Sequence, residues 1–270
     1  MLLLVSVILA AGVLLATQRY GTRPLLPLTV LLCLAAVALF DPGVGLAPLM
    51  GLIAGFQVER RRSYGQVVVV AALPGAALSL WLLLNQEGAV REKLAGQLTE
   101  QLEGMGMQAV EGGYSLRQMI DSVLRVQPAI EFIVLLLTAI LAYRVGLWGA
   151  QRLGLVLPPA RPFHLWRPWE ELIWVLIGAL VMGLIGAGLL EDLALNAAMV
   201  MLILYAVQGL ALVRYYILRL GIARPLELLF YILLFFTLGL ALLVLAGLGL
   251  LDTWFDWRRL RPAADQEEEA

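Results

Sequence analysis

The chain has 270 residues, of which 61% are hydrophobic and 14% are charged, and its mean hydropathy is +0.89. Soluble domains contain about half apolar and about a quarter charged residues, so this composition excludes a soluble domain. The formal net charge of -1 provides no basic surface for nucleic acid, and the single cysteine, Cys33, excludes a disulfide or a thiolate metal site within one chain.

Eight apolar runs follow one another along the chain: 2–17, 25–40, 45–58, 66–84, 128–150, 171–190, 195–213 and 226–251. A helix needs about 17–25 residues to cross about 30 Å of hydrocarbon. Backbone groups in lipid must be satisfied within their own segment, so the runs are predicted to be helices. The expected fold is therefore an all-α, multi-pass membrane protein with about eight spans.

The expected organisation is a single membrane domain with one polar insertion. Its parts are four N-terminal spans (1–84), the insertion (85–127), four C-terminal spans (128–251), and an interfacial aromatic-basic segment with an acidic tail (252–270). No basic residue precedes the first run, so we expect it to be a retained helix and not a cleaved signal peptide.

Basic residues gather in alternate gaps between the runs. Twelve of the 19 Lys and Arg residues lie in the gaps 18–24, 59–65, 144–170 and 214–225. The positive-inside rule predicts that these gaps are cytoplasmic and that both termini are outside. The three arginines of the tail do not fit this orientation, because the rule would place them on the cytoplasmic side. The short third run is compatible with a re-entrant segment. Without it as a span, however, 10 basic residues lie on one side of the membrane and 9 on the other, so the bias nearly disappears. Eight spans is therefore the preferred interpretation.

The insertion has helical patterning. Apolar residues recur at every fourth position from Val90 to Leu102 between charged residues, which predicts an amphipathic helix. A capping-box pattern at Ser115 predicts the start of a second short helix with an apolar side. We interpret the insertion as an interfacial helix pair, with a cap over the outer mouth of a binding cavity as the alternative.

Few charges lie inside the spans, which argues against a proton pump or an ion-coupled transporter. The deepest polar side chain is that of Gln208, which is followed by Gly209. An unpaired amide is costly in hydrocarbon, so we expect Gln208 to hydrogen-bond to another helix, with ligand binding as the alternative. Pro74 and Gly75 are expected to kink the fourth span.

Small residues recur at helix-packing spacing in two spans. Gly51 and Gly55 lie in the third, and Ala179, Gly183 and Ala187 lie in the sixth. Such faces allow the close approach of two backbones. We expect them to pack inside the protein, and an oligomer or partner interface is the alternative.

Two aromatic-basic elements, 161–170 and 249–259, carry the remaining candidate residues. These candidates are Pro162, Phe163, Trp166, Arg167 and Trp169 in the first element and Asp252, Asp256 and Arg258 in the second. Tryptophan here is typical of a membrane-interface belt. The two aspartates, four residues apart, would share one helix face and pair with nearby arginines or with lipid phosphates.

Catalytic motifs are missing from the sequence. The single histidine, His164, lies in a predicted loop, and neither an HExxH motif nor a cysteine-histidine pair occurs. With one histidine and one cysteine, a histidine or thiolate metal site is excluded, and no cofactor is expected. An enzyme that acts on a lipid phosphate through Asp252, Asp256 and arginines is a remote alternative.

The two aromatic-basic elements resemble those of the YybS-like predicted membrane proteins of bacteria. Pro162 to Trp166 matches a Pro-Phe-x-x-Trp element, and Gly249 to Arg258 matches Gly-(Ile/Leu)-(Ile/Leu)-Asp-x-x-Phe-Asp-x-Arg. The step from Gln208 to Leu210 also fits, and the resemblance extends over nearly the whole chain. It implies a multi-pass protein of the bacterial cytoplasmic membrane. Members often have one more span before the turn at Arg19, which would make the amino terminus cytoplasmic.

That family is distantly similar to the substrate-capture subunits of energy-coupling-factor transporters, which dock on a transmembrane coupling protein with ATPases. The first hypothesis is a substrate-binding membrane subunit without its own energy source. The second is a scaffold that organises envelope proteins. The first predicts a cavity lined partly by Gln208 and by residues 166–169, whereas the second predicts a sealed bundle. The sequence defines neither the ligand nor the oligomeric state.

Overall fold

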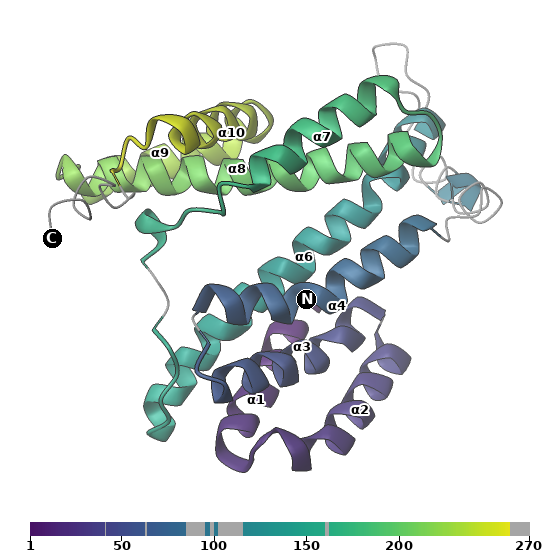
Figure 1. The fold of residues 1–270 in the computed structure, drawn as a ribbon, viewed down its shortest axis with the longest axis vertical. Helices are drawn as coiled ribbons and strands as arrows, with labels where there is room; N and C mark the ends of the chain where they lie inside the picture. Colours follow the sequence, from purple (N-terminus) through teal and green to yellow (C-terminus); the bar gives the residue numbers. More distant parts are fainter. Residues whose placement is uncertain are drawn as a thin grey trace, which may run out of the picture. The chain divides into compact units, whose positions relative to one another are not determined.

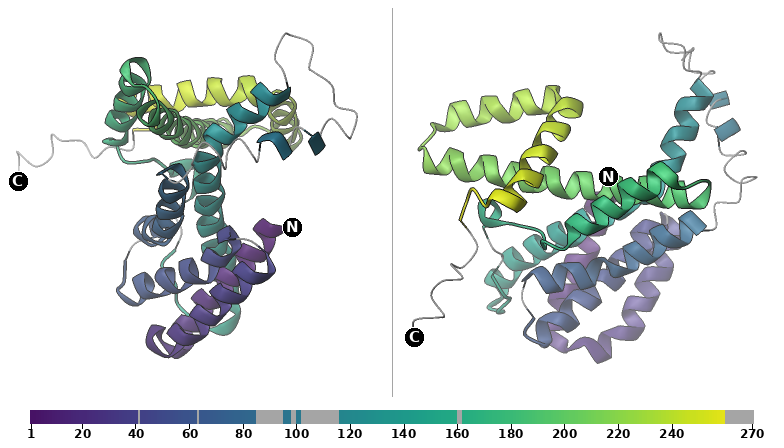
Figure 2. Two further views of the ribbon diagram at one scale, coloured as in Figure 1. Left: turned by 90° about the vertical axis from the view of Figure 1, so that its right-hand side faces the viewer. Right: turned by 45° about the horizontal axis from the view of Figure 1, so that its top comes forward.

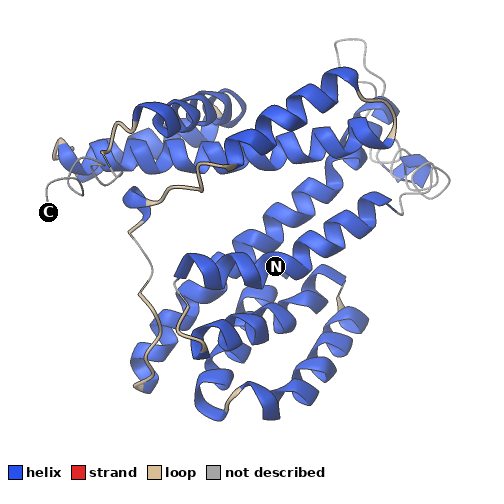
Figure 3. Cartoon of the chain, viewed as in Figure 1, coloured by secondary structure: helices blue, strands red, loops and turns tan. Residues whose placement is uncertain are grey.

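The computed structural model describes residues 1–40, 42–62, 64–84, 95–97, 100–101, 116–159 and 162–259. The elements within these ranges are helices, and no strand occurs among them (Figure 3). Six helices are long and apolar enough to cross a membrane by length and composition: α1 (Leu2–Tyr20), α2 (Thr22–Leu39), α4 (Tyr64–Leu84), α6 (Leu116–Leu153), α8 (Leu189–Arg219) and α10 (Leu238–Phe255). The expected all-α, multi-pass membrane fold is confirmed.

Two shorter apolar helices accompany them, α3 (Pro42–Glu59) and α7 (Leu172–Ile185), together with α9 (Arg224–Phe236) and a 3-10 turn, η1 (Phe163–Leu165) (Figure 1). The chain forms two compact units. The first contains residues 1–160 and 187–196, and the second contains residues 161–186 and 197–270.

In the first unit, α3 packs against α1, α2, α4 and α6. Gly51 and Gly55 are buried on the side of α3 that faces α1. A Cβ atom at Gly51 would lie 3.0 Å from the carbonyl carbon of Ala10, and one at Gly55 would lie 2.6 Å from the Cβ of Thr17. These glycines therefore let two helices approach closely, in the manner that their spacing predicts.

The fourth span runs through its Pro-Gly pair as one continuous helix. Gly75 faces α6, where an added Cβ would lie 2.9 Å from the Cβ of Leu135. Leu135 belongs to the buried core of this unit, together with Leu14, Met50, Val67 and Tyr143. Gly75 therefore allows close packing of α4 against α6.

The boundary between the sixth and seventh spans differs from the predicted one. α7 ends at Ile185 and α8 begins at Leu189, so Ala187 lies in the turn and Gly183 is exposed. The expected stripe of Ala179, Gly183 and Ala187 is therefore wrong beyond Ala179, which is buried. Gly188, at φ 61°, allows the turn between α7 and α8. Because the residues around it are apolar, hydropathy does not reveal this break.

The eighth predicted span is two helices. α9 ends at Phe236 and α10 begins at Leu238, with Thr237 between them at φ -105° and ψ 27°. The hydroxyl of Thr237 donates a hydrogen bond of 2.9 Å to the carbonyl of Leu233, a bond that competes with regular helix geometry. α10 then continues to Phe255, beyond the predicted end at 251. Figure 2 shows α9 and the end of α8 from two further directions.

α6 also corrects the predicted organisation, because it joins the second helix of the insertion and the fifth span in one helix of 38 residues. Ile120 and Leu124 pack against Ala95 of the insertion, while Met119 and Val123 are exposed. Most of the predicted first helix between Val90 and Leu102, and the capping residue Ser115, lie outside the described residues.

A proline inside α6 explains an interaction that the sequence reading missed. Asn196 of α8 inserts its side chain at the turn that contains Pro128. Its Nδ2 donates to the carbonyl of Arg125 at 2.8 Å, and its Oδ1 accepts from the N–H of Ala129 at 2.8 Å. These two backbone groups are the partners that a regular helix would join to each other. The Asn196 amide therefore replaces one backbone hydrogen bond and holds α8 against α6 within the first unit.

Asn196→Leu is expected to destabilise the first unit, because two backbone groups in a buried region lose their partners. An unsatisfied buried polar group costs about 1–3 kcal/mol, so we expect a loss of about 2–4 kcal/mol. Asn196→Asp keeps the acceptor but not the donor and should lose less than the leucine variant. Thermal unfolding of the purified protein in detergent measures the difference, and equal midpoints for wild type and Asn196→Leu would contradict it.

Candidate functional site

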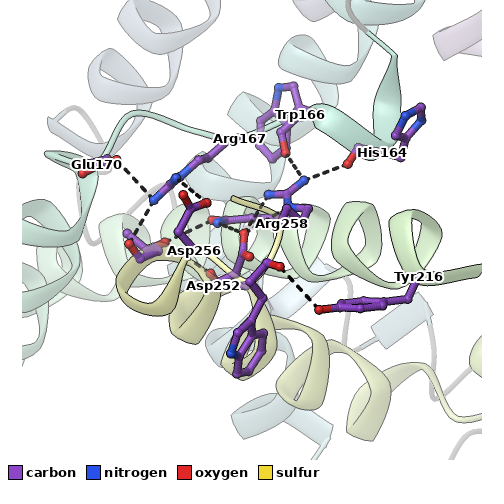
Figure 4. A network of polar contacts seen from close by, with 12 residues as sticks. His164, Trp166, Arg167, Glu170, Tyr216, Asp252, Asp256 and Arg258 are labelled. Atoms are coloured by element: carbon purple, nitrogen blue, oxygen red, sulfur yellow. Dashed lines mark hydrogen bonds and ion pairs between the residues drawn. The ribbon is translucent and has the colours of Figure 1, made fainter. Parts of the chain in front are cut away.

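The end of α10 carries a buried carboxylate. Asp252 lies in the last turn of the helix and its side chain is 0% exposed. The helix ends at Asp256, whose left-handed conformation (φ 42°, ψ 52°) is one that aspartate adopts more readily than most residues. This turn reverses the chain, so that Arg258 comes back alongside the helix and points its side chain at Asp252 (Figure 4).

Arg258 forms a buried ion pair with Asp252. Its Nη2 and Nε lie 2.7 and 3.2 Å from Oδ2 of Asp252. Its Nη1 donates to the carbonyls of His164 and Trp166 at 2.9 and 3.0 Å. One guanidinium therefore neutralises the carboxylate and also fixes the segment that precedes α7, an arrangement that suits the planar fork of arginine.

Gln208 joins α8 to the same carboxylate. Its Nε2 donates to Oδ2 of Asp252 at 3.1 Å, and its Oε1 accepts from the hydroxyl of Thr253 at 3.3 Å. The predicted hydrogen bond from Gln208 to another helix is confirmed, and both partners come from α10.

Two glycines make this contact between α8 and α10 possible. A Cβ atom at Gly209 would lie 2.7 Å from the carbonyl carbon of Leu245, and one at Gly249 would lie 2.8 Å from the nitrogen of Gly209. Backbone atoms cannot move aside as a flexible side chain can, so both positions need glycine. The buried residues around them, Met201, Tyr205, Ala206, Leu245 and Ala246, form the core of the second unit.

A second arginine completes the network from the first aromatic-basic element. Nη1 of Arg167 lies 3.2 Å from Oδ1 of Asp256, and its Nη2 donates to the carbonyl of Thr253 at 2.9 Å. The same Nη2 lies 3.2 Å from Oε1 of Glu170. We call Arg167, Gln208, Asp252, Thr253, Asp256 and Arg258 the C-terminal polar cluster.

The structure thus brings the two predicted elements, 161–170 and 249–259, together. Several of their aromatic side chains are exposed, whereas the central ion pair is buried. Trp254 and Phe255 are 55% and 65% exposed, whereas Asp252 and Arg258 are buried. Trp169 is likewise exposed, at 59%. Asp252 pairs with Arg258, in agreement with the expected pairing of the aspartates with nearby arginines, and the exposed aromatic residues fit a membrane-interface belt. Residues 260–270, with the predicted acidic tail, lie outside the described residues.

The two remaining candidates lie at the start of the segment that Arg258 holds. Pro162 is exposed and its carbonyl accepts the N–H of Leu165 at 3.0 Å. Phe163 is 36% exposed, and its carbonyl accepts the N–H of Trp166 at 3.0 Å. These two bonds form the turn η1, which presents the carbonyls of His164 and Trp166 to Arg258.

An apolar groove lies next to the polar cluster within the second unit. Its volume is about 590 Å³, within the range of ligand pockets in proteins. Its walls come from α8, α9, α10, the turn between α8 and α9, and Trp257, two residues beyond α10. The lining residues include Leu212, Tyr216, Ile222, Leu226, Leu233 and Leu248. The Tyr216 hydroxyl lies 3.5 Å from the carbonyl of Trp257, so the chain reversal at Asp256 also positions one wall (Figure 4).

One charged pair borders this groove. Glu227, in the first turn of α9, lines it and forms an ion pair with Arg214 of α8. Gln208 and residues 166–169 are not among the lining residues of this groove, so their predicted place in a cavity wall stays a prediction. Spacing in the sequence does not predict the groove, because the groove depends on two breaks in an apolar region: the turn at Gly221, which returns α9 beside α8, and the break at Thr237, which separates α9 from α10.

The site has no features of a metal centre. Among the described residues, no group of three or more His, Cys, Asp or Glu side chains is placed to hold a metal ion. The carboxylates of Asp252 and Asp256 are each paired with an arginine.

Comparison with known proteins places this chain in a family. No curated protein and no solved structure matches it. A family model described as a predicted membrane protein (DUF2232) matches residues 1–253, which include all of the described helices except the end of α10. The matched region contains Gln208, Gly209 and Asp252. The chain therefore belongs to the predicted membrane protein family DUF2232.

Proposed function

We propose that the protein is a substrate-binding membrane subunit that takes a ligand with a hydrocarbon chain from the bilayer into the groove between α8, α9 and α10. The groove carries this proposal, since a volume of about 590 Å³ bounded by apolar side chains suits a hydrocarbon chain. Its opening among apolar helices gives such a ligand a route from the lipid phase.

The C-terminal polar cluster supports the groove as a positioning element. Gln208 and Thr253 hold α10 against α8, and the ion pair of Asp252 with Arg258 fixes the chain on either side of Trp257. Since Asp252 has no exposed surface, we assign it this positioning role and propose no catalytic one.

The resemblance to the YybS-like proteins, and more distantly to the substrate-capture subunits of energy-coupling-factor transporters, supports a role in transport. It implies that the protein in a bacterial cytoplasmic membrane docks on a transmembrane coupling protein with ATPases. Gentle extraction of the tagged protein from native membranes tests this point. Stoichiometric recovery of a coupling protein with ATPases supports transport, whereas recovery of envelope-synthesis proteins without an ATPase supports the scaffold instead.

Filling the groove is expected to prevent ligand binding. Leu248→Trp places a larger side chain in the groove wall, whereas Leu243→Trp changes an exposed position of the same helix that does not line the groove. A diazirine-bearing hexadecanol serves as the probe, because it has a long chain and no charge. We expect saturable labelling of peptides from α8, α9 and α10 in the wild type, and about tenfold less in Leu248→Trp, equivalent to about 1.4 kcal/mol.

The control variant Leu243→Trp should be labelled like the wild type. Both variants are first compared with the wild type for thermal unfolding, and Leu229→Trp replaces Leu248→Trp should the latter unfold. Labelling that is spread over all helices, or that is unchanged in a folded groove-filling variant, would rule out the groove as a binding site.

A further inference from the structure

We infer that the groove selects an anionic phospholipid, whose phosphate lies at the turn between α8 and α9 while one acyl chain occupies the groove. This inference rests on the proposed function and specifies its ligand class. It is drawn from two arginines that lie within two residues of groove-lining positions in the chain, Arg219 after Ile217 and Arg224 before Leu226.

The segment from 214 to 227 is basic. It contains Arg214, Arg219 and Arg224 and a single acidic residue, Glu227, which gives a formal charge of +2. Glu227 is paired with Arg214. Arg219 and Arg224 are exposed, and neither side chain has a hydrogen-bonding or ionic partner among the residues that the structure describes. Two cationic side chains are therefore available to an anion.

These two arginines lie at one end of the groove. Tyr216 and Ile217, before the turn, line the groove, as do Ile222 and Leu226 after it. The turn itself is tight: Gly221 has φ 65°, and the N–H of Ile222 donates to the carbonyl of Ile217 at 3.1 Å. Arg219 and Arg224 flank this turn, so a headgroup there can meet both while its chain follows α9 from Leu226 toward Leu233.

The length and the membrane side of this arrangement also fit a phospholipid. From Leu226 to Leu233 the helix rises roughly 10 Å, enough for a substantial part of one acyl chain. The alternation of basic gaps predicts that the 214–225 turn is cytoplasmic, and basic pockets between helices on that side are typical sites for anionic headgroups.

A lipid-retention experiment tests the inference on the full chain. The purified protein is exchanged into a neutral detergent with equal amounts of phosphatidylglycerol and phosphatidylcholine, and bound lipids are counted by native mass spectrometry. With about 1 kcal/mol for each arginine near an anionic headgroup, we expect about a 30-fold preference for phosphatidylglycerol. The double variant Arg219→Gln/Arg224→Gln should bind both lipids nearly equally.

The matched control is Arg61→Gln/Arg62→Gln, which removes two exposed arginines from the turn after α3, on the same predicted side of the membrane. It should keep the full preference. An equal loss in this control would show a general attraction between basic protein and anionic lipid, and would overturn the inference.

The outcomes separate this inference from the function on which it rests. If hexadecanol labelling depends on Leu248 but the wild type retains both phospholipids equally, the groove is a binding site that does not select an anion. That result would overturn this inference and leave the proposed function standing. Loss of lipid retention in Leu248→Trp, together with loss of preference in Arg219→Gln/Arg224→Gln alone, supports both. Displacement of phosphatidylglycerol by a second copy of the chain would show that the groove is an interface, and would overturn both.

Discussion

Arg258→Met is expected to be the most destabilising of the substitutions considered, because it leaves the Asp252 carboxylate buried and without a counter-ion. Breaking a buried ion pair from one side costs about 3–5 kcal/mol. The substitution also removes the donors to the carbonyls of His164 and Trp166. With about 2–4 °C for each kcal/mol in a protein of this size, we expect the unfolding midpoint in detergent to fall by about 6–20 °C.

A double variant distinguishes loss of the ion pair from loss of packing. Asp252→Leu/Arg258→Met removes both charges, and replacing a buried pair with apolar residues is often neutral or stabilising. We expect it to recover much of the loss, except for the contribution of the bonds from Arg258 to residues 164 and 166 and of the bond from Gln208 to Asp252. Arg258→Lys keeps the charge but not the planar set of donors, and should fall between the wild type and Arg258→Met. A double variant no more stable than Arg258→Met would contradict a dominant role for charge.

Gly249→Val is expected to separate α10 from α8 and to break the bonds of Gln208. An added Cβ would lie 2.8 Å from the backbone nitrogen of Gly209 and 3.0 Å from the carbonyl carbon of Tyr205, and neither atom can move without its helix. Overpacking costs about 1–3 kcal/mol, and the lost hydrogen bonds of Gln208 and Asp252 add about 0.5–2 kcal/mol. We expect a lower unfolding midpoint and, because α10 forms one wall of the groove, weaker labelling by the hexadecanol probe.

Gly247 provides the control for this prediction. It lies on the same helix two residues earlier, and no atom lies within 4 Å of the position where its Cβ would be. Gly247→Val therefore changes the helix propensity by a similar amount without the clash. Its free energy of unfolding should stay within about 1 kcal/mol of the wild-type value. Equal effects of the two valine variants would mean that close approach of α8 and α10 is not what Gly249 provides.

Apart from Thr253, the residues of the polar cluster were candidates on the sequence, and pairing of the aspartates with nearby arginines was expected, but the individual pairs were not predicted. Polar residues such as Gln208 and Asp252 stand out in or beside an apolar run, because each needs a partner there. Which arginine meets which aspartate depends on the left-handed turn at Asp256, which returns Arg258 to Asp252 and leaves Asp256 to Arg167. A local sequence pattern does not predict that geometry.

Asn196 shows the same limit more strongly. It lies 67 residues from Ala129, and its role depends on α8 passing the turn of α6 that contains Pro128, where the proline ring disfavours regular helix geometry. A hydropathy reading treats Asn196 as a polar residue near a span end and Pro128 as the start of another span. Neither observation alone predicts that one side chain replaces a backbone hydrogen bond of a distant helix.

By itself, the sequence determined that this is an all-helical, multi-pass membrane protein with small-residue packing faces, because hydropathy and residue spacing are local properties that act within one segment. The tertiary structure decided where the helices break, which charges are buried and paired, and that α8, α9 and α10 border an open apolar groove. Those features arise from contacts between segments distant in the chain. In an apolar sequence of this kind, many residues are compatible with lipid or with a neighbouring helix, and only their packing distinguishes the two.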